Sequence, residues 1–246
     1  MKTINISLAH DAFTQFGGAE RVFEAAVEVF PNSEIYTIAV DKANMDAEVK
    51  DWNLVVSPLQ FLYNIHSKLT HWFFLIPIIF KFWKPVKSKV LLSFSSSFIK
   101  AISKPKQSIH INYCHTPTRF LWIDPQHAYK EIPKFLHPIA KLYFTWMKKW
   151  DLKSASKIDK WIANSKEVQS RIKKIYGQES QVLYPFIDET FWKPTREKQN
   201  YFLIAGRLQY AKGLETVISV FNSLGWELHV VGTGRYEKNL KCALIS

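Results

Sequence analysis

The spacing of apolar residues alternates along the chain between a strand-like and a helix-like pattern. Short runs rich in β-branched residues predict strands at residues 4–8, 34–40, 53–56, 90–94, 108–113 and 161–163. After the first run, Ala19, Val22 and Phe23 begin an i, i+3, i+4, i+7 spacing that continues to Phe30 and predicts a helix. Strands that alternate with helices predict an α/β fold with a parallel sheet.

A further helix is predicted from about residue 165 to residue 176. Asn164 and Glu167 have the spacing of a capping box at its start, and Gly177 is expected to end it. This helix follows the strand predicted at residues 161–163, so the alternation of strands and helices continues through the first three quarters of the chain.

A change of composition then divides the chain. Pro185, Pro194 and a polar, charged run interrupt the periodicity, so we predict a first domain over residues 1–185, a linker at 186–200 and a second domain over 201–246. The second domain holds one strand–helix–strand unit, which leaves the faces and edges of its sheet poorly covered. We therefore expect this second domain to be incomplete, as a truncated version of a larger one.

The charge balance favours an anionic partner. The chain has 33 Lys and Arg against 21 Asp and Glu, a formal net charge of +12, which suits nucleic acid, a membrane surface or a phosphorylated ligand. Cys114 and Cys242 lie far apart without metal-ligand spacing, so neither a disulfide framework nor a zinc site is indicated. Because the N-terminus lacks the pattern of a signal peptide and no apolar run is long enough to span a bilayer, we expect a cytoplasmic protein.

Two glycines, Gly17 and Gly18, stand between the first predicted strand and its helix. The N-terminus of a helix offers free backbone N–H groups and a positive dipole end, which can hold a phosphate. The pattern lacks the three glycines of a dinucleotide fingerprint and the lysine of a P-loop. From these residues alone, a plain tight turn stays open beside a phosphate site.

A second candidate segment, "YCHTPTRFLWID", leaves the carboxyl end of a predicted strand, where open α/β sheets place their ligands. His115 could donate a hydrogen bond to a sugar hydroxyl, Arg119 could bind phosphate and Trp122 could stack on a sugar ring. The alternative is a loop histidine packed beneath Pro117.

A third segment, "GRLQYAKG", places Arg207 and Lys212 between a strand and a helix of the second domain. Two cations beside a helix N-terminus suit a diphosphate, whereas the alternative is a solvated turn. The later "VVGTGR" is ambiguous in the same way, because its two spaced glycines also follow a strand.

The interval from Trp52 to Ile123 contains no Asp or Glu but eight lysines and one arginine. Aromatic and aliphatic residues flanked by lysines suit docking onto an anionic membrane interface. The residues expected to dock are Trp72, Lys81, Trp83, Lys84 and Lys87. The alternative is a buried helix with an incidental basic rim, and no recognition motif for nucleic acid is present.

Seven segments in collinear order resemble the family 4 glycosyltransferases of the GT-B fold, which has two Rossmann-like domains, and in particular their mannosyltransferase-like branch in surface-polysaccharide and O-antigen synthesis. They are "GGAERV" (17–22), "LLSFSSSFIK" (91–100), "YCHTPTRFLW" (113–122), "IANSKEVQSRIKKIYG" (162–177), "VLYPFID" (182–188), "GRLQYAKG" (206–213) and "VVGTGR" (230–235). The resemblance implies a Rossmann-like acceptor-side domain followed by the start of a nucleotide-sugar-binding domain.

The resemblance also implies roles for individual residues. Gly17 and Gly18 would lie beside the donor diphosphate, with Gly18 at the reacting centre, and His115 would act there as a catalytic residue near the sugar. Arg207 and Lys212 would bind the diphosphate. The implied reaction moves a hexose from a nucleotide sugar, expected to be GDP-mannose, to a glycan or lipid-linked oligosaccharide with retention of configuration. No metal or other cofactor is expected, and no Asp-x-Asp motif occurs.

Two departures from the family pattern bear on activity. The pair of glutamates that the family carries later in its second domain would fall beyond residue 246, and Phe186 stands where a second proline is common. We therefore expect weak binding of a nucleotide sugar by this chain. The alternative function is a non-catalytic remnant at the inner face of the cytoplasmic membrane, binding acceptor lipid or the anionic surface itself.

Overall fold

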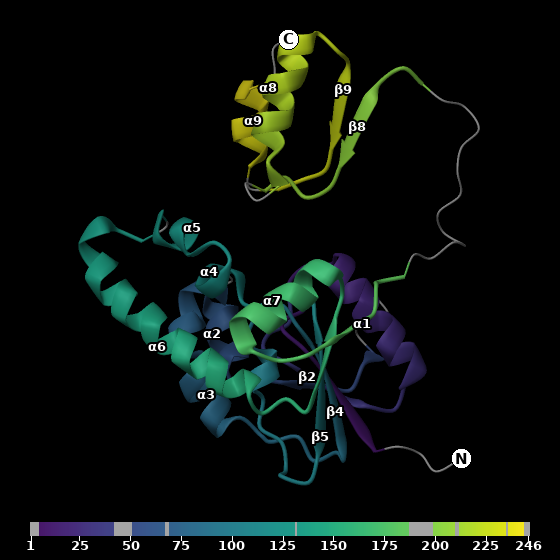
Figure 1. Ribbon diagram of the computed structural model, residues 1–246, viewed down its shortest axis with the longest axis vertical. Helices are drawn as coiled ribbons and strands as arrows, with labels where there is room; N and C mark the ends of the chain where they lie inside the picture. The colour runs from purple at the N-terminus through teal and green to yellow at the C-terminus, as the bar shows by residue number, and fades with distance from the viewer. Residues whose placement is uncertain are drawn as a thin grey trace. The chain divides into compact units, whose positions relative to one another are not determined.

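The computed structural model describes residues 5–41, 51–66, 69–130, 132–186, 199–209, 212–234 and 236–243. The chain divides into two compact units, unit 1 over Met1–Phe186 and unit 2 over Ile187–Ser246. Each is described by itself (Figure 1).

Unit 1 is built on a parallel sheet of seven strands in the order β3-β2-β1-β4-β5-β6-β7. The strands are β1 (Ile6–His10), β2 (Glu34–Thr37), β3 (Leu54–Val56), β4 (Val90–Ser95), β5 (Ile109–Cys114), β6 (Lys160–Ala163) and β7 (Gln181–Val182). The α-helices are α1 (Gly18–Val29), α2 (Leu59–Ile65), α3 (Ile76–Phe82), α4 (Arg119–Trp122), α5 (Pro125–Lys130), α6 (His137–Ala155) and α7 (Lys166–Tyr176). Short 3-10 helices occupy η2 (Leu69–Leu75), η3 (Ile99–Ala101) and η4 (Lys134–Leu136).

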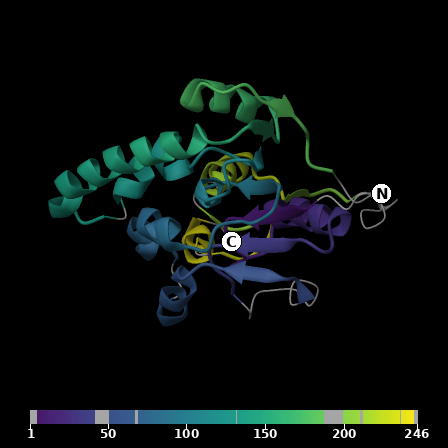
Figure 2. The same ribbon diagram turned by 90° about the horizontal axis from the view of Figure 1, so that it is seen from below.

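Helices cover both faces of this sheet because neighbouring strand residues point to opposite sides. On β1, Leu8 packs in a cluster with Phe23 of α1, whereas the next residue, Ala9, packs in a cluster with Phe80 of α3 and Met147 of α6. Figures 1 and 2 show the same division, with α1 on one side of the sheet and α2, α3 and α6 on the other. The sheet is therefore the middle layer of three.

A polar network lies inside the core between β4 and β5. The hydroxyl of Ser93 lies 2.7 Å from Nε2 of His110, and the amide of Asn112 donates to the Ser93 hydroxyl at 2.7 Å. The hydroxyl of Ser95 donates to the side-chain oxygen Oδ1 of Asn112 at 3.0 Å. The hydrogen bonds satisfy polar groups that burial would otherwise leave costly.

The burial of His110 predicts a stability that falls in acid. Burial, together with the nearby Lys104 ammonium, lowers the pKa of His110 to about 3 from its ordinary 6.5. Below pH 6.5 the unfolded chain binds a proton that the folded chain does not, so the free energy of unfolding falls as the pH drops. From pH 6.5 to about pH 5 the loss is about 2 kcal/mol. Urea titrations of wild type and His110→Asn should differ by that amount over this range, and parallel pH dependences would contradict the argument.

The start of α7 differs from the predicted capping box. Ser165, not Asn164, is the N-cap, and its hydroxyl accepts the backbone N–H of Val168 at 3.2 Å. Glu167 pairs instead with Arg171 one turn later, at 2.9 Å. Serine caps a helix as well as asparagine does, so two adjacent capping residues leave the boundary ambiguous by one position.

Unit 2 contains β8 (Phe202–Ala205), α8 (Leu214–Leu224), β9 (Leu228–Val231) and α9 (Glu237–Ala243), with β8 and β9 paired in parallel. Its small core includes the buried residues Leu208, Leu214, Ile218 and Leu240. A Cβ at Gly232 would lie 1.8 Å from the carbonyl oxygen of Gly206. Close packing of the two strand-end loops therefore accounts for the first glycine of "VVGTGR".

Candidate functional site

The order of the strands marks one position in unit 1 as the place for a ligand. Strands β2 and β3 are added on one side of β1, whereas β4 and the strands after it are added on the other side. The strand order therefore reverses between the adjacent strands β1 and β4. Open α/β sheets bind ligands at the carboxyl ends of the strands beside such a switch. Here that edge is formed by the loops that follow β1, β4 and β5.

Asp11 ties two of these loops together. Its carboxylate follows β1 directly and accepts the backbone N–H groups of Ser96 at 2.6 Å, Ser97 at 2.7 Å, Phe98 at 2.8 Å and Ile99 at 2.8 Å. These groups lead into the N-terminus of η3, where a negative charge is favoured. The side chain is buried. Asp11 therefore fixes the loop after β4 against the end of β1.

Two imidazoles stand beside Asp11, of which His10 is buried and His115 is half-buried. Burial, and then the neighbouring His115, lower the pKa of His10 to about 3, and burial lowers the pKa of His115 to about 4 against an opposing effect of Asp11. Both rings are therefore neutral at pH 7. Nδ1 of His10 and Nε2 of His115 have no hydrogen-bond partner among the described residues. A neutral imidazole with a free nitrogen can exchange a hydrogen bond with a ligand hydroxyl.

A third unpartnered polar atom lies at the same edge. The hydroxyl of Ser97, in the loop after β4, is buried and without a partner among the described residues. Buried polar atoms are nearly always paired, so three atoms around one carboxylate that the described residues leave unpaired require an explanation. The sequence pattern singled out His115 but not His10, Asp11 or Ser97.

Gly17 and Gly18 lie at the same edge, at the start of α1. Gly17 is the N-cap in an extended conformation, with φ −164°, which any residue can adopt. A Cβ at Gly18 would meet nothing within 4 Å among the described residues. Neither backbone strain nor crowding by these residues requires glycine at position 18. Close approach of a ligand would explain it.

The first turn of α1 also carries a carboxylate that the sequence pattern did not single out. Glu20 is buried, with 6% of its surface exposed. A negative side chain at this position is stabilised by the positive end of the helix dipole. The N-terminus of α1 therefore already faces a negative charge, so a diphosphate bound nearby would require cations from elsewhere.

Trp122, a predicted sugar-stacking residue, is half-buried and has several contacts within unit 1. Its indole N–H donates to the Asp151 carboxylate at 2.8 Å, Lys148 lies over the ring at 5.1 Å, and the edge of Tyr176 packs against it. These contacts fix the ring between α6 and α7. Arg119, at the start of α4, has an exposed side chain and stays a candidate for ligand binding.

Asp151 is the centre of a buried network that the sequence did not reveal. Its carboxylate, fully buried, forms an ion pair with Lys100 at 2.7 Å and accepts the hydroxyls of Thr118 at 3.2 Å and Tyr176 at 2.9 Å. The side chain of Lys100 is only 2% exposed. The network joins η3, α4, α6 and α7.

The predicted membrane-docking tryptophans are also placed differently. Trp83 is 5% exposed and packs against Tyr36 and Phe80, so it belongs to the core. The indole N–H of Trp72 donates to the carbonyl of His66 at 3.2 Å, and its ring is half-buried against that core. Burial of Trp83 corrects the expectation that its ring inserts into a membrane, whereas docking by Trp72 stays a prediction.

The lysines of the same predicted surface are exposed at Lys81, Lys84 and Lys87. Among the residues that the structure describes, no helix is both long enough and apolar enough to cross a bilayer.

In unit 2, Arg207 and Lys212 lie on the loop between β8 and α8. Both side chains are exposed, and Lys212 directly precedes Gly213, the N-cap of α8. The left-handed conformation of Gly213, with φ 64°, explains the glycine at that position. Two cations beside a helix N-terminus suit an anionic ligand.

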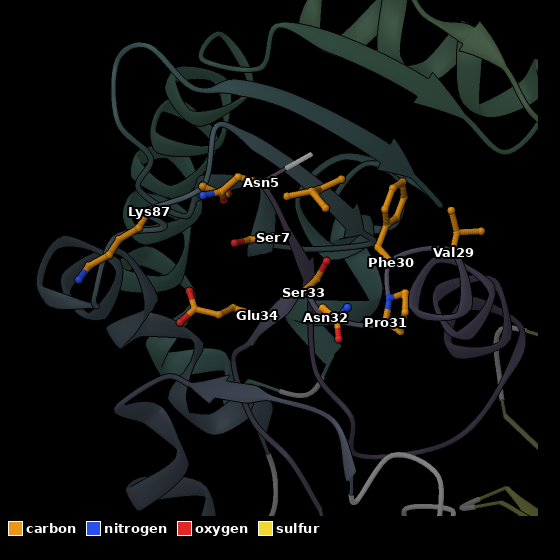
Figure 3. Close-up of a pocket in the computed structure, with 11 residues that line it drawn as sticks. Asn5, Ser7, Val29, Phe30, Pro31, Asn32, Ser33, Glu34 and Lys87 are labelled. Atoms are coloured by element: carbon orange, nitrogen blue, oxygen red, sulfur yellow. The ribbon is translucent and has the colours of Figure 1, made fainter. Parts of the chain in front are cut away.

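One hollow of unit 1 lies away from this edge. A cavity of about 750 Å³ is lined by Asn5, Ser33, Glu34 and Lys87, among others, at the amino ends of β1 and β2 (Figure 3). Ligands of open α/β sheets bind at the opposite, carboxyl end. Over the described residues, no cluster of three or more His, Cys, Asp or Glu side chains could hold a metal ion.

No family model matches the chain, and no curated protein matches it. Solved structures do match. The crystal structure of Anabaena Alr3699/HepE in complex with UDP and glucose aligns with a TM-score of 0.59 and 13% sequence identity, over 97% of this chain and 64% of that chain. The chain thus spans less than two thirds of that protein's length. The likeness and the parallel sheet confirm the predicted α/β, Rossmann-like fold.

Proposed function

We propose that the chain is a glycosyltransferase of the GT-B type that takes a hexose from a nucleotide sugar. The observation that carries the proposal is the cluster at the carboxyl edge of β1, β4 and β5. There the described residues leave polar atoms of His10, Ser97 and His115 unpaired and leave open space beside Gly18. A sugar has the hydroxyls that such atoms bind. The fold shared with HepE, a protein solved with UDP and glucose, supports the same proposal.

In the proposed reaction His115 contacts the transferred sugar. Its neutral ring exchanges a hydrogen bond with a sugar hydroxyl and stays uncharged through the physiological range, because burial holds its pKa near 4. The backbone at Gly18 leaves room for the sugar and the phosphate attached to it. Arg119, exposed on α4, is the proposed contact for the acceptor.

The proposed donor diphosphate is neutralised by Arg207 and Lys212. Developing negative charge on a departing diphosphate is stabilised by cations that are already in place, which lowers the barrier to transfer. We further propose a metal-independent reaction with retention of configuration, GDP-mannose as donor, and a glycan or lipid-linked oligosaccharide as acceptor at the cytoplasmic face of the membrane. This places the chain in the mannosyltransferase-like branch of family 4.

Transfer of radiolabelled mannose from GDP-mannose to a lipid-linked acceptor tests the proposal. The assay is run with this chain and with a chain whose second unit is extended to the length of the HepE chain. We expect transfer from the extended chain, and weaker transfer from the 246-residue chain. Absence of transfer from both, with GDP-mannose and with UDP-glucose, would contradict the proposal. Membrane binding without transfer would favour the second candidate, a non-catalytic binding module.

Gly18→Ala separates binding from folding. Because alanine favours a helix over glycine by about 0.5 to 1 kcal/mol, the free energy of unfolding should stay the same or rise. The added methyl group would occupy the open space beside the proposed donor, so we expect its dissociation constant to rise roughly ten-fold, a loss of about 1.4 kcal/mol. Calorimetric titration with the nucleotide sugar measures this. Glu28→Ala, in the exposed last turn of α1, is the control and should bind as wild type.

A further inference from the structure

An exposed apolar row runs along α6 and the 3-10 turn before it. Phe135 is 80% exposed, Ile139 67%, Leu142 74% and Trp146 45%. Ile139, Leu142 and Trp146 follow an i, i+3, i+7 spacing, and Phe135 lies about one turn earlier, so the four share one side of the helix. We call these four residues the α6 stripe. Contiguous exposed apolar surface of this kind marks an interaction site.

The α6 stripe is not a part of the core. Phe144, Met147 and Asp151 on the other side of α6 are buried, and that side faces the sheet. Within unit 1, α6 lies along the outer side in both views (Figures 1 and 2). The stripe therefore faces away from the elements of unit 1 that α6 covers.

The charges around the α6 stripe have one sign. Between Ile132 and Trp150 the sequence contains no Asp or Glu, and Lys134, Lys141 and Lys149 are exposed there. The next carboxylate on α6, Asp151, is fully buried and paired with Lys100, so it does not offset these charges. Over residues 132–150, α6 and the turn before it therefore combine apolar side chains, a tryptophan and cations without an exposed carboxylate.

We propose that the α6 stripe docks unit 1 onto an anionic lipid bilayer. Apolar and aromatic side chains of an interfacial helix enter the boundary between head groups and acyl chains, while lysines are attracted to the negative surface. A second copy of the chain suits the stripe less well, because a symmetric contact would bring the two sets of lysines together. The proposal does not rest on glycosyl transfer, since binding to vesicles needs no sugar.

The proposal differs from the docking surface expected from the sequence. That surface relied on Trp72 and Trp83, which are half-buried and buried. Its exposed apolar residues in α3 include Ile78, 54% exposed, and Phe82, 74% exposed beside Lys81 and Lys84. A variant at Phe82 therefore distinguishes the two surfaces.

Sedimentation with vesicles tests the α6 stripe. The full chain is mixed with vesicles of phosphatidylcholine and phosphatidylglycerol, or of phosphatidylcholine alone. Phe135→Ser with Leu142→Ser should lower the partition coefficient about 100-fold, since two inserted apolar side chains are lost. Lys141→Glu with Lys149→Glu should lower binding to the anionic vesicles by more than ten-fold. Val29→Ser, at an exposed apolar residue of α1, is the matched control and should bind as wild type.

Three outcomes would overturn the proposal. Both α6 variants could bind like wild type, or Phe82→Ser alone could abolish binding, which would move the contact to α3. The α6 variants could also dissociate a dimer in a chain that does not bind vesicles, which would assign the stripe to a second copy. Circular dichroism controls for folding, and the exposed positions changed here should leave the helical signal intact.

Discussion

Asp151→Ala should destabilise the chain by about 3 to 5 kcal/mol, because removing one partner of a buried ion pair leaves the other charge buried and uncompensated. Lys100, with a side chain only 2% exposed, would be left without its carboxylate. Thr118, Trp122 and Tyr176 would lose their shared acceptor at the same time. This loss is a large part of the total stability of an ordinary domain.

A double variant separates the charge from the packing. Lys100→Met with Asp151→Leu removes both charges and should recover most of the lost free energy of unfolding. Glu167→Ala is the control, since its ion pair with Arg171 on the surface of α7 is worth no more than about 0.5 kcal/mol. Urea titrations followed by tryptophan fluorescence measure all three. A cost below about 1 kcal/mol for Asp151→Ala would contradict the assigned role of the network.

His115→Ala should lower the catalytic efficiency of sugar transfer by about 100-fold to 10,000-fold if the imidazole contacts the reacting sugar. Nε2 of His115 has no hydrogen-bond partner among the described residues, so the variant loses no hydrogen bond between this atom and those residues. The rate should therefore fall far more than the stability. His66→Ala, in the exposed loop after α2, should transfer at the wild-type rate.

The outcome is judged on rate and stability together. Kinetics with the extended chain gives kcat/KM, and thermal unfolding gives the stability of each variant. A His115→Ala variant that transfers within a factor of about three of wild type would remove this residue from the proposed site, since a lost catalytic contact costs much more. A variant that loses rate only as it unfolds would assign His115 to packing.

The spacing of apolar residues predicted the layered fold, because this spacing depends only on residues that are close together in the sequence. The alternation of buried strands and amphipathic helices is written directly in the sequence, and each predicted strand of unit 1 overlaps an observed strand. The predicted ends of the strands were less accurate. The first strand was predicted at residues 4–8 and β1 is Ile6–His10, which brings Asp11 directly to the carboxyl edge. Polar residues at strand ends carry little periodic signal.

Contacts between distant segments explain what the sequence could not predict. Asp11 accepts hydrogen bonds from Ser96 and Ser97, and Lys100 pairs with Asp151, although nothing in the local pattern links these positions. Trp83 was expected at a surface because lysines surround it, yet its ring fills the core. Side-chain burial follows from the packing of neighbouring elements, which composition alone does not encode.

Hydrogen–deuterium exchange of the full chain with and without GDP-mannose or UDP-glucose tests most directly where a nucleotide sugar binds. We expect slower exchange in peptides that cover residues 11–18, 96–99 and 113–118, at the carboxyl edge of the unit 1 sheet. We expect no change in residues 29–34, which line the cavity at the amino ends of the strands. Protection confined to residues 29–34, or no protection with either nucleotide sugar, would show that the proposed site is wrong.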